Sequence, residues 1–288
     1  MNRGSTGRKG RTLGYKRHML VGTWNLRSGI ENEANYEMAR QTLHERQLDI
    51  LCIPEAAKSG QGSERGPNGE AIHWVGPENN ERRQNKGVAL MCSPYAARCI
   101  ISHTYVSDRI LVISFAMLNN LTLDVIAFYA PHSSMRAEVR KTFRQQLNSV
   151  RKSLNRHHFV LELGDANALV GSATPDAPDF RGALGNQGIG NQNAAGKAFL
   201  DDCAAAGLCV ANTFFPHKDI HKYSYRGLNT HVAPGAAPEH VLYNNDFVLV
   251  RRSFLSSVQD VKVYRGVNGG PNFTRSDHHL VVAKLKLK

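Results

Sequence analysis

Near the end of the chain, Ser276, Asp277 and His278 stand just before an apolar run at 280–285. The run is rich in Val and Leu and predicts a strand, so the polar step lies at the mouth of that strand. A carboxylate and an imidazole placed there can reach one cleft. The carboxylate suits a divalent cation, and the imidazole can position or move a proton near neutral pH. This chemistry requires partners from other segments.

Polar side chains follow other predicted strands in the same way. The strands predicted at 19–25, 49–55, 121–129 and 158–167 end in Asn25, Glu55, Tyr129, Asp165 and Asn167. A further strand is predicted at 241–250 and contains Asp246, a carboxylate that needs a partner if buried; a histidine is a good one. Taken singly, such residues are often turn or cap residues. Together they indicate a site, because ligands and catalytic groups collect where strands leave an α/β sheet.

The segments between these residues must supply the scaffold. Apolar residues at helical spacing predict helices at 31–49, 136–154 and 194–206, and further strands are predicted at 86–92, 99–106, 110–117, 208–212, 256–264 and 279–287. Segments 59–70 and 170–193 are rich in Gly, Asn and Pro, which predicts loops. Strands and helices interleave without a linker. We therefore expect one α/β domain with mixed sheets at 18–288.

Composition narrows the class of partner. The 288 residues carry a formal net charge of +12, which favours a polyanionic partner, either nucleic acid or an anionic membrane surface. Residues 1–17 contain six Lys and Arg and no acidic residue, so we expect a disordered basic arm. Such an arm either touches phosphates or directs the protein to the nucleus, or is simply a solvated tail. The chain has no run of about 18 apolar residues, which argues against a membrane span.

The five cysteines form no C-x-x-C pair and are expected to be buried free thiols in a reducing compartment. A nucleotide cofactor is not expected, because there is no G-x-G-x-x-G or Walker loop.

At these residues the chain resembles the endonuclease/exonuclease/phosphatase superfamily, the DNase I-like fold. The matching segments follow the family's order: Thr-Trp-Asn at 23–25, Ile-Pro-Glu at 53–55, Tyr-Ala-Pro at 129–131, Leu-Gly-Asp-Ala-Asn at 163–167, Asn-Asp-Phe at 245–247 and Ser-Asp-His at 276–278. Stretches 190–222, 260–266 and 276–288 look more narrowly like the endonuclease domain of non-LTR (LINE) retrotransposons of the RTE kind. The resemblance implies an α/β (α+β) fold, a four-layer sandwich of two mixed β-sheets flanked by helices.

The resemblance also implies a divalent-metal-dependent DNA endonuclease that nicks one strand and leaves a 3′-hydroxyl. Glu55 would be the main ligand of Mg²⁺ or Mn²⁺, supported by Asn25 and Asp277. Such a cation takes few carboxylates and keeps waters, which suits a phosphodiester substrate.

The same resemblance assigns roles to the remaining residues. Asp165 would orient or deprotonate the attacking water, while Asn167 and Tyr129 would hold phosphate oxygens. His278 would bind the phosphate or transfer a proton, with Asp246 fixing its tautomer.

Double-stranded DNA is the expected partner, within a nuclear protein derived from a retroelement or a larger retroelement polyprotein. The basic arm would contact the DNA together with Arg82, Arg83, Lys86, Arg136, Arg140, and Tyr225 and Arg226 in the loop predicted before Asp246. Three alternatives remain open: an abasic-site repair endonuclease, a phosphatase of inositol lipids or sphingomyelin hydrolase, and a chromatin- or DNA-binding module that has lost turnover.

Overall fold

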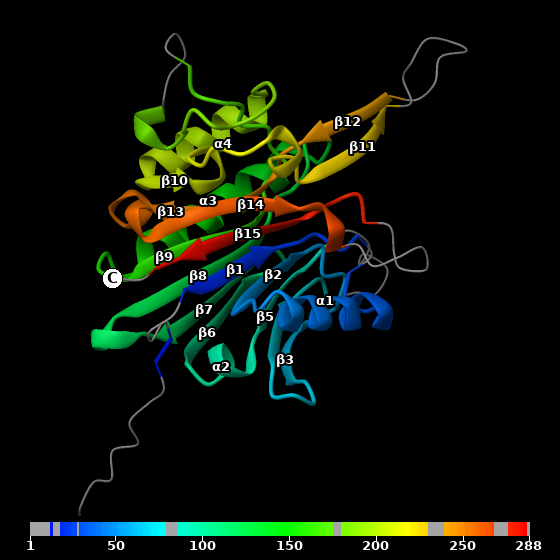
Figure 1. Ribbon diagram of the computed structural model, residues 1–288, viewed down its shortest axis with the longest axis vertical. Coiled ribbons are helices and arrows are strands. Elements are labelled where there is room, and N and C mark those ends of the chain that lie inside the picture. Colours follow the sequence, from blue (N-terminus) through cyan, green and yellow to red (C-terminus); the bar gives the residue numbers. More distant parts are fainter. Residues whose placement is uncertain are drawn as a thin grey trace, which may run out of the picture.

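Two β-sheets packed face to face form the centre of the molecule (Figure 1). The computed structural model describes residues 12–13, 18–27, 29–78, 86–174, 180–229, 239–267 and 276–286. Arg82 and Arg83 lie outside the described residues, as does most of the predicted basic arm. Within that arm, Leu13 is described and buried, and it forms a parallel bridge with Met117.

The first sheet has seven strands in the order β14-β15-β1-β2-β5-β4-β3. Their bounds are β1 Met19–Thr23, β2 Ile50–Pro54, β3 Gln61–Arg65, β4 Ala71–Val75, β5 Val88–Cys92, β14 Val258–Tyr264 and β15 Leu280–Leu285. β1 and β2 are parallel, whereas β15 runs antiparallel to β1. All five residues of β2 are buried, as expected of a continuously apolar strand covered on both faces.

The second sheet has six strands in the order β10-β13-β9-β8-β7-β6. Their bounds are β6 Ile100–Ser107, β7 Ile110–Ala116, β8 Thr122–Tyr129, β9 Phe159–Asp165, β10 Leu208–Val210 and β13 Asp246–Arg251. β8 and β9 are parallel, and the other neighbouring pairs are antiparallel. A separate hairpin pairs β11 (Tyr225–Asn229) with β12 (Glu239–Tyr243).

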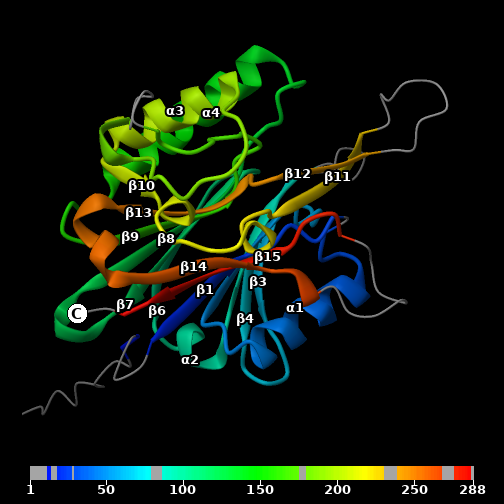
Figure 2. The same ribbon diagram turned by 45° about the horizontal axis from the view of Figure 1, so that its top comes forward.

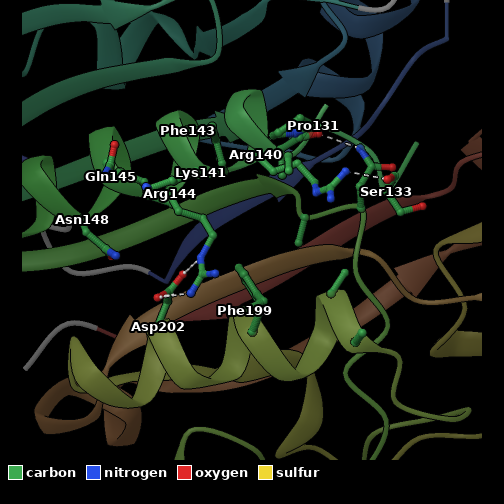
Figure 3. Close-up of a pocket in the computed structure, with 18 of the residues that line it drawn as sticks. Pro131, Ser133, Arg140, Lys141, Phe143, Arg144, Gln145, Asn148, Phe199 and Asp202 are labelled. Atoms are coloured by element: carbon green, nitrogen blue, oxygen red, sulfur yellow. Dashed lines mark hydrogen bonds and ion pairs between the residues drawn. The ribbon is translucent and has the colours of Figure 1, made fainter. Parts of the chain in front are cut away.

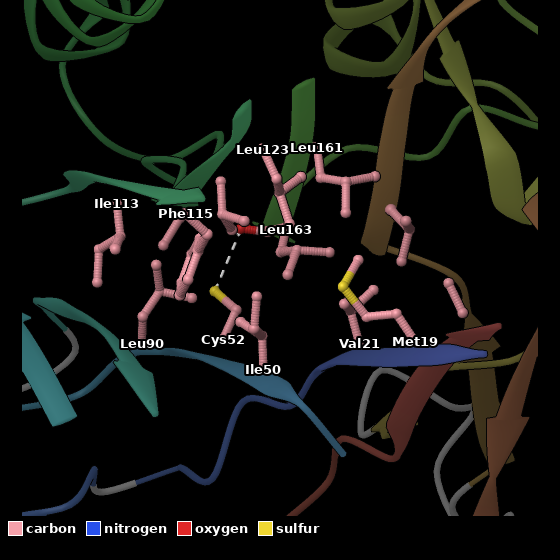
Figure 4. Packing of buried hydrophobic residues seen from close by; sticks show 14 of the residues in the cluster. Met19, Val21, Ile50, Cys52, Leu90, Ile113, Phe115, Leu123, Leu161 and Leu163 are labelled. Carbon is pink, nitrogen blue, oxygen red and sulfur yellow. Dashed lines mark hydrogen bonds between the residues drawn. The ribbon is translucent and has the colours of Figure 1, made fainter. Parts of the chain in front are cut away.

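The main apolar core lies between the two sheets (Figure 4). Ile50 and Cys52 of the first sheet face Leu163 and Phe115 of the second, and the Cys52 thiol donates to the Leu163 carbonyl at 3.2 Å. All five cysteines are free and buried, as predicted.

Helices cover the outer faces of the sandwich (Figure 2). Their bounds are α1 Glu33–Glu45, α3 Ala137–Ser153 and α4 Ala194–Ala205, whereas the short helix α2 (Pro94–Ala97) packs against the core between the sheets. α1 packs against the first sheet, whereas α3 and α4 cover the second. The α3 residues Phe143, Leu147 and Val150 are buried at helical spacing, so the stripe visible in the sequence is the face that packs. The predicted α/β sandwich of two mixed sheets is therefore confirmed. No helix among the described residues is both long and apolar enough to cross a bilayer.

Three local predictions differ from the structure. Segment 59–70, predicted as a loop, contains β3, an edge strand whose exposed polar side chains carry no apolar pattern. β11 was likewise predicted as part of a loop. The strand predicted at 241–250 is two strands, since β12 ends at Tyr243 and β13 begins at Asp246.

Candidate active site

Both sheets bring their polar strand ends to one edge. β8 and β9 run parallel and place Tyr129 opposite Asp165. β13 runs antiparallel to β9 and therefore begins at this edge, with Asp246 opposite Asp165. Asp246 was expected within a strand; its actual position at the strand's first residue puts its carboxylate at the shared edge.

Ser276, Asp277 and His278, which precede β15, lie at the same edge because β15 runs antiparallel to β1. The Trp24 indole N–H donates to the His278 carbonyl at 3.2 Å, and the Ser276 hydroxyl donates to the Asn25 carbonyl at 2.7 Å. These bonds join residues more than 250 positions apart in the chain. The predicted convergence of the two segments is thus a direct contact.

His278 and Asp246 form a buried pair. Nδ1 of His278 lies 2.7 Å from Oδ2 of Asp246, and the side chains are 8% and 0% exposed. Burial lowers the pKa of His278, but the charge and hydrogen bond of Asp246 and the charge of Asp165 together raise it to about 9. The imidazole is therefore protonated at neutral pH and held in one orientation.

Asp165 lies beside this pair. Its Oδ1 accepts the Asn167 backbone N–H at 2.8 Å, and its Oδ2 lies 3.4 Å from Asn25 Nδ2. Burial and the charge of Asp246 raise the pKa of Asp165 to about 7, against the opposing charge of His278. A carboxyl group with a pKa near neutral is suited to accept a proton from water.

Asp165, Asp246 and His278 could hold a metal by distance, since their ligand atoms lie within 4.8 Å of one another. His278 Nδ1 already contacts Asp246, however, so only Nε2 of that ring remains as a possible metal ligand. The other oxygen of that carboxylate, Asp246 Oδ1, is buried and has no hydrogen-bond partner among the described residues. The trio thus brings one imidazole and two carboxylates together and leaves one carboxylate oxygen unpaired among the described residues.

Tyr129 and Asn167 stand next to the trio. Burial, followed by the charge of Glu55, raises the pKa of Tyr129, so the phenol remains protonated; a hydrogen bond to Glu55 adds to the shift. The Arg109 guanidinium lies 5.2 Å from the centroid of the Tyr129 ring and donates to its carbonyl at 3.2 Å. Asn167 has a φ of 46°, and its Nδ2 donates to the Ala130 carbonyl at 2.8 Å.

The three predicted metal ligands lie at the ends of β1 and β2 and before β15. Glu55 follows β2 directly and has a φ of 57°, a left-handed conformation that is uncommon outside glycine and often found at functional sites. Asn25 Oδ1 accepts the Arg27 backbone N–H at 3.0 Å, and Asp277 Oδ2 lies 3.3 Å from Arg27 Nη1. Glu55, Asn25 and Asp277 offer oxygen donors alone, which fits a hard divalent cation. Arg27 supplies a positive charge at this position and would share Asp277 with such an ion.

The predicted DNA-contacting residues fall in three places. Lys86 Nζ lies 3.9 Å from the Asp108 carboxylate, and exposed Arg136 is the N-cap of α3. Arg140 donates to the carbonyls of Ser133 and Met135, so it orders the loop before α3.

Tyr225 and Arg226 lie on β11, beside the trio rather than in a loop. The Tyr225 ring packs edge-on against His278 with centroids 4.9 Å apart, and it stacks on Tyr243 at 6.2 Å. The Arg226 backbone N–H donates to the Asp277 carbonyl at 2.7 Å. The hairpin is thereby joined to the Ser-Asp-His segment.

Sequence reasoning missed several supporting residues. The Ser224 hydroxyl accepts the backbone N–H groups of Asn245 and Asp246, each at 3.2 Å, and so fixes the start of β13. Arg109 sits behind Tyr129, and Arg27 contacts Asp277. The proximity of Arg27 to Asn25 in the chain was a usable signal; nothing in the sequence pattern marks Ser224 or Arg109.

The sequence of this chain was compared with protein-family models and with known proteins. The chain matches no family model. It is 29% identical over 273 residues to craniofacial development protein 2 of Tragulus javanicus and of Bos taurus, which covers 95% of this chain but 43% and 42% of those proteins. The chain thus spans less than half the length of the curated relatives it matches.

Three solved structures share the fold. The endonuclease domain of TRAS1, a telomere-specific non-LTR retrotransposon, has a TM-score of 0.60 at 13% identity and aligns over 94% of this chain and 99% of its own. The 3′-5′ exonuclease NExo of Neisseria meningitidis scores 0.64 at 16% identity, over 93% and 100% of the two chains. An AP endonuclease of Archaeoglobus fulgidus scores 0.62 at 15%, also over 93% and 100%. Identities this low establish the fold alone: the chain has the DNase I-like α/β sandwich fold.

Proposed function

We propose that the protein is a divalent-metal-dependent endonuclease that hydrolyses a phosphodiester bond of DNA and nicks one strand. The observation that carries the proposal is the buried His278–Asp246 pair with Asp165 beside it. The arrangement supplies a fixed cationic donor and a carboxyl group poised to accept a proton, at the edge where the sheets gather their polar residues.

Each side chain has a role that follows from its surroundings. Asp165 takes a proton from the attacking water, whose oxygen bonds to phosphorus as the P–O3′ bond breaks; O3′ gains a proton and the phosphate remains on the 5′ end. His278 donates to a phosphate oxygen, and Asp246 keeps its ring oriented. Tyr129 and Asn167 donate to the other oxygens.

Glu55, Asn25 and Asp277 would hold Mg²⁺ or Mn²⁺, which would stabilise negative charge on the phosphate and the leaving oxygen. The net charge of +12 supports DNA as the polyanionic partner. The solved structures with the same fold include proteins described as endonucleases, and this supports the reaction class by analogy of fold.

Derivation from a retrotransposon is part of the proposal, on the resemblance of segments 190–222 and 260–266 to LINE endonuclease domains. We further propose that 18–288 is one catalytic domain, that the basic arm contacts phosphates, and that the protein acts in the nucleus, alone or within a polyprotein.

A second candidate function is cleavage at abasic sites. It is favoured by the aromatic wall of Tyr225 and Tyr243 beside His278, against which an extrahelical sugar could pack. Rates on an intact duplex and on a duplex with one abasic site separate the two candidates. A preference for the intact duplex supports target nicking, and a preference for the abasic duplex supports repair.

Relaxation of supercoiled plasmid in Mg²⁺ tests the proposed reaction. We expect the wild-type chain to relax the plasmid, and Glu55→Ala or His278→Ala to abolish relaxation. His158→Ala is a matched control, because His158 also pairs with an aspartate but lies away from this edge. If wild type and both site variants leave the plasmid equally intact across divalent metals, the nuclease proposal fails and a DNA-binding module becomes the better explanation.

A further inference from the structure

A groove opens between α3 and α4 next to the candidate site (Figure 3). It has a volume of about 630 Å³, and Ala130, Pro131 and Asn167 line it at the site. A second hollow of about 340 Å³ shares Asn148 and Arg151 with it. The α3–α4 groove therefore follows most of α3, a helix of 17 residues that is roughly 25 Å long.

The groove carries more positive than negative charge. Arg151 forms a buried two-bond ion pair with Glu162 at 2.8 and 2.7 Å, so these two charges cancel. Lys141 and Lys152 are exposed, and neither has an acidic partner among the described residues. The charge favours a polyanion over a neutral ligand.

The floor of the groove is apolar and includes an aromatic ring. Phe143 and Leu147 of α3 and Phe199 of α4 line it. The Phe199 ring stacks on Phe247 of β13, with centroids 5.7 Å apart and planes 23° apart, which holds the ring in place. An aromatic floor beneath a cationic rim is the combination that binds single strands, since bases stack on the ring while cations follow the phosphates.

We propose that the α3–α4 groove holds an unpaired DNA strand that continues from the phosphate cut at the candidate site. This inference rests on the proposed function and specifies its substrate as DNA with a single-stranded segment beside the cleavage point. Asn167 supports the continuity, because it both lines the groove and contacts Asp165. Duplex DNA keeps its base faces stacked inside the helix, so it gains nothing from Phe199.

One ion pair crosses the groove. The Arg144 guanidinium of α3 reaches Asp202 of α4 through two bonds of 2.6 and 2.8 Å (Figure 3). Arg144 is 48% exposed, so a phosphate could compete for it. Asp202 therefore weakens strand binding, and its neutralisation should strengthen it.

Binding measured without divalent metal tests the proposal without cleavage. The full chain is titrated into a labelled blunt duplex and into the same duplex with a short oligothymidylate tail on the 3′ or the 5′ end, and fluorescence anisotropy gives the Kd. We expect one of the two tails, either the 3′ or the 5′ tail, to lower the Kd by about tenfold relative to the blunt duplex, which is about 1.4 kcal/mol. Lys141→Glu and Phe199→Leu should each remove this gain, whereas Asp202→Asn should enlarge it.

Lys197→Glu is the matched control, because Lys197 is an exposed α4 lysine that does not line the groove. It should retain the full ratio of tailed to blunt affinity. Thermal melting confirms that each variant is folded. The proposal is overturned if neither tail tightens binding, if Lys197→Glu loses as much of the ratio as Lys141→Glu, or if polyglutamate displaces protein as well as oligothymidylate does.

The plasmid assay keeps this inference separate from the proposed reaction. A chain that relaxes plasmid but ignores both tails retains the nuclease proposal and loses the groove proposal. A chain that leaves plasmid intact yet binds the tail through Lys141 retains the groove and loses the nuclease.

Discussion

Two His–Asp pairs in this molecule have nearly the same geometry. His278 Nδ1 lies 2.7 Å from Asp246 Oδ2, and His158 Nδ1 lies 2.8 Å from Asp124 Oδ2. Both aspartates are buried in the second sheet. Asp124 lies five residues before Tyr129 on β8, roughly 17 Å along the strand from the edge that carries the candidate site.

The pairs differ in what the second carboxylate oxygen does. Asp124 Oδ1 accepts the Ser114 hydroxyl at 2.6 Å, so both of its oxygens are bonded. Asp246 Oδ1 is buried without a hydrogen-bond partner among the residues that the structure describes, and a second carboxylate, Asp165, raises the local negative charge. Satisfied hydrogen bonds indicate a structural pair, whereas an unused acceptor beside a second carboxylate is open to a further donor such as a water molecule.

The largest expected effect is on the rate. Asp246→Asn should lower the rate of plasmid nicking on the order of a thousandfold, because a neutral amide stabilises the imidazolium of His278 less well and fixes its ring less firmly. The loss should appear in kcat rather than in KM, which the initial rates at varied DNA concentration separate.

Asp124→Asn is the matched change at the other pair. It makes the same substitution at the same type of contact, so the rate should stay within about twofold of wild type. Equal losses in both variants would mean that the candidate site has no special dependence on its own pair.

The second expected effect is on the free energy of unfolding, which should depend more on the His158–Asp124 pair than on the His278–Asp246 pair. Asp124→Ala should lower the free energy of unfolding by about 2 kcal/mol, because Ser114 and His158 both lose their partner. Asp246→Asn should change it by less than about 1 kcal/mol, because the lost charge also relieves repulsion with Asp165. Urea unfolding monitored by circular dichroism measures both.

The two outcomes together separate chemistry from folding. If Asp246→Asn destabilises the protein as much as Asp124→Ala does, its slow nicking reflects damage to the fold, and the distinction between the pairs fails.

The convergence at the candidate site could be predicted because its residues lie close to visibly apolar strands. Asn25 and Glu55 follow such strands by one or two residues. The start of β13 could not be predicted, because Asn244 and Asn245 interrupt a run that otherwise continues in strand-like residues. The sequence pattern suggested Asp246 as a partner of His278 but put it in the interior of a strand.

The His158–Asp124 pair was not predicted because it depends on sheet register. Asp124 and His158 become neighbours when β9 aligns parallel to β8, with Leu123 opposite Phe159. The polar edge strand β3 and the hairpin strand β11 were missed for a related reason: backbone pairing defines them, and their side chains carry no apolar alternation.

The third expected effect is the pH dependence of stability, which tests whether the aspartate or burial controls a histidine's charge. His73 is buried with no carboxylate partner in the part of the chain that the structure describes, and burial, followed by the charges of His103 and Arg65, lowers its pKa to about 4. The folded state favours its neutral form, so its contribution to stability is present above about pH 6.5 and is lost as the pH falls toward 4. His278, with its pKa raised to about 9, behaves in the opposite way: its contribution is lost as the pH rises from about 6.5 toward 9.

Between about pH 7 and pH 4, the free energy of unfolding of wild type should therefore fall by on the order of 2 kcal/mol more than that of His73→Phe. Above about pH 7 the two proteins should show the same pH dependence. Urea unfolding of wild type and variant across that range gives the difference directly, so carboxylates common to both proteins cancel. The pairing with Asp246 is what gives His278 its positive charge, because His73 is also buried and loses its proton. If the free energy of unfolding falls equally in wild type and His73→Phe as the pH is lowered, burial like that of His73 does not keep a histidine neutral. The charge of His278 could then not be attributed to Asp246 by contrast with His73.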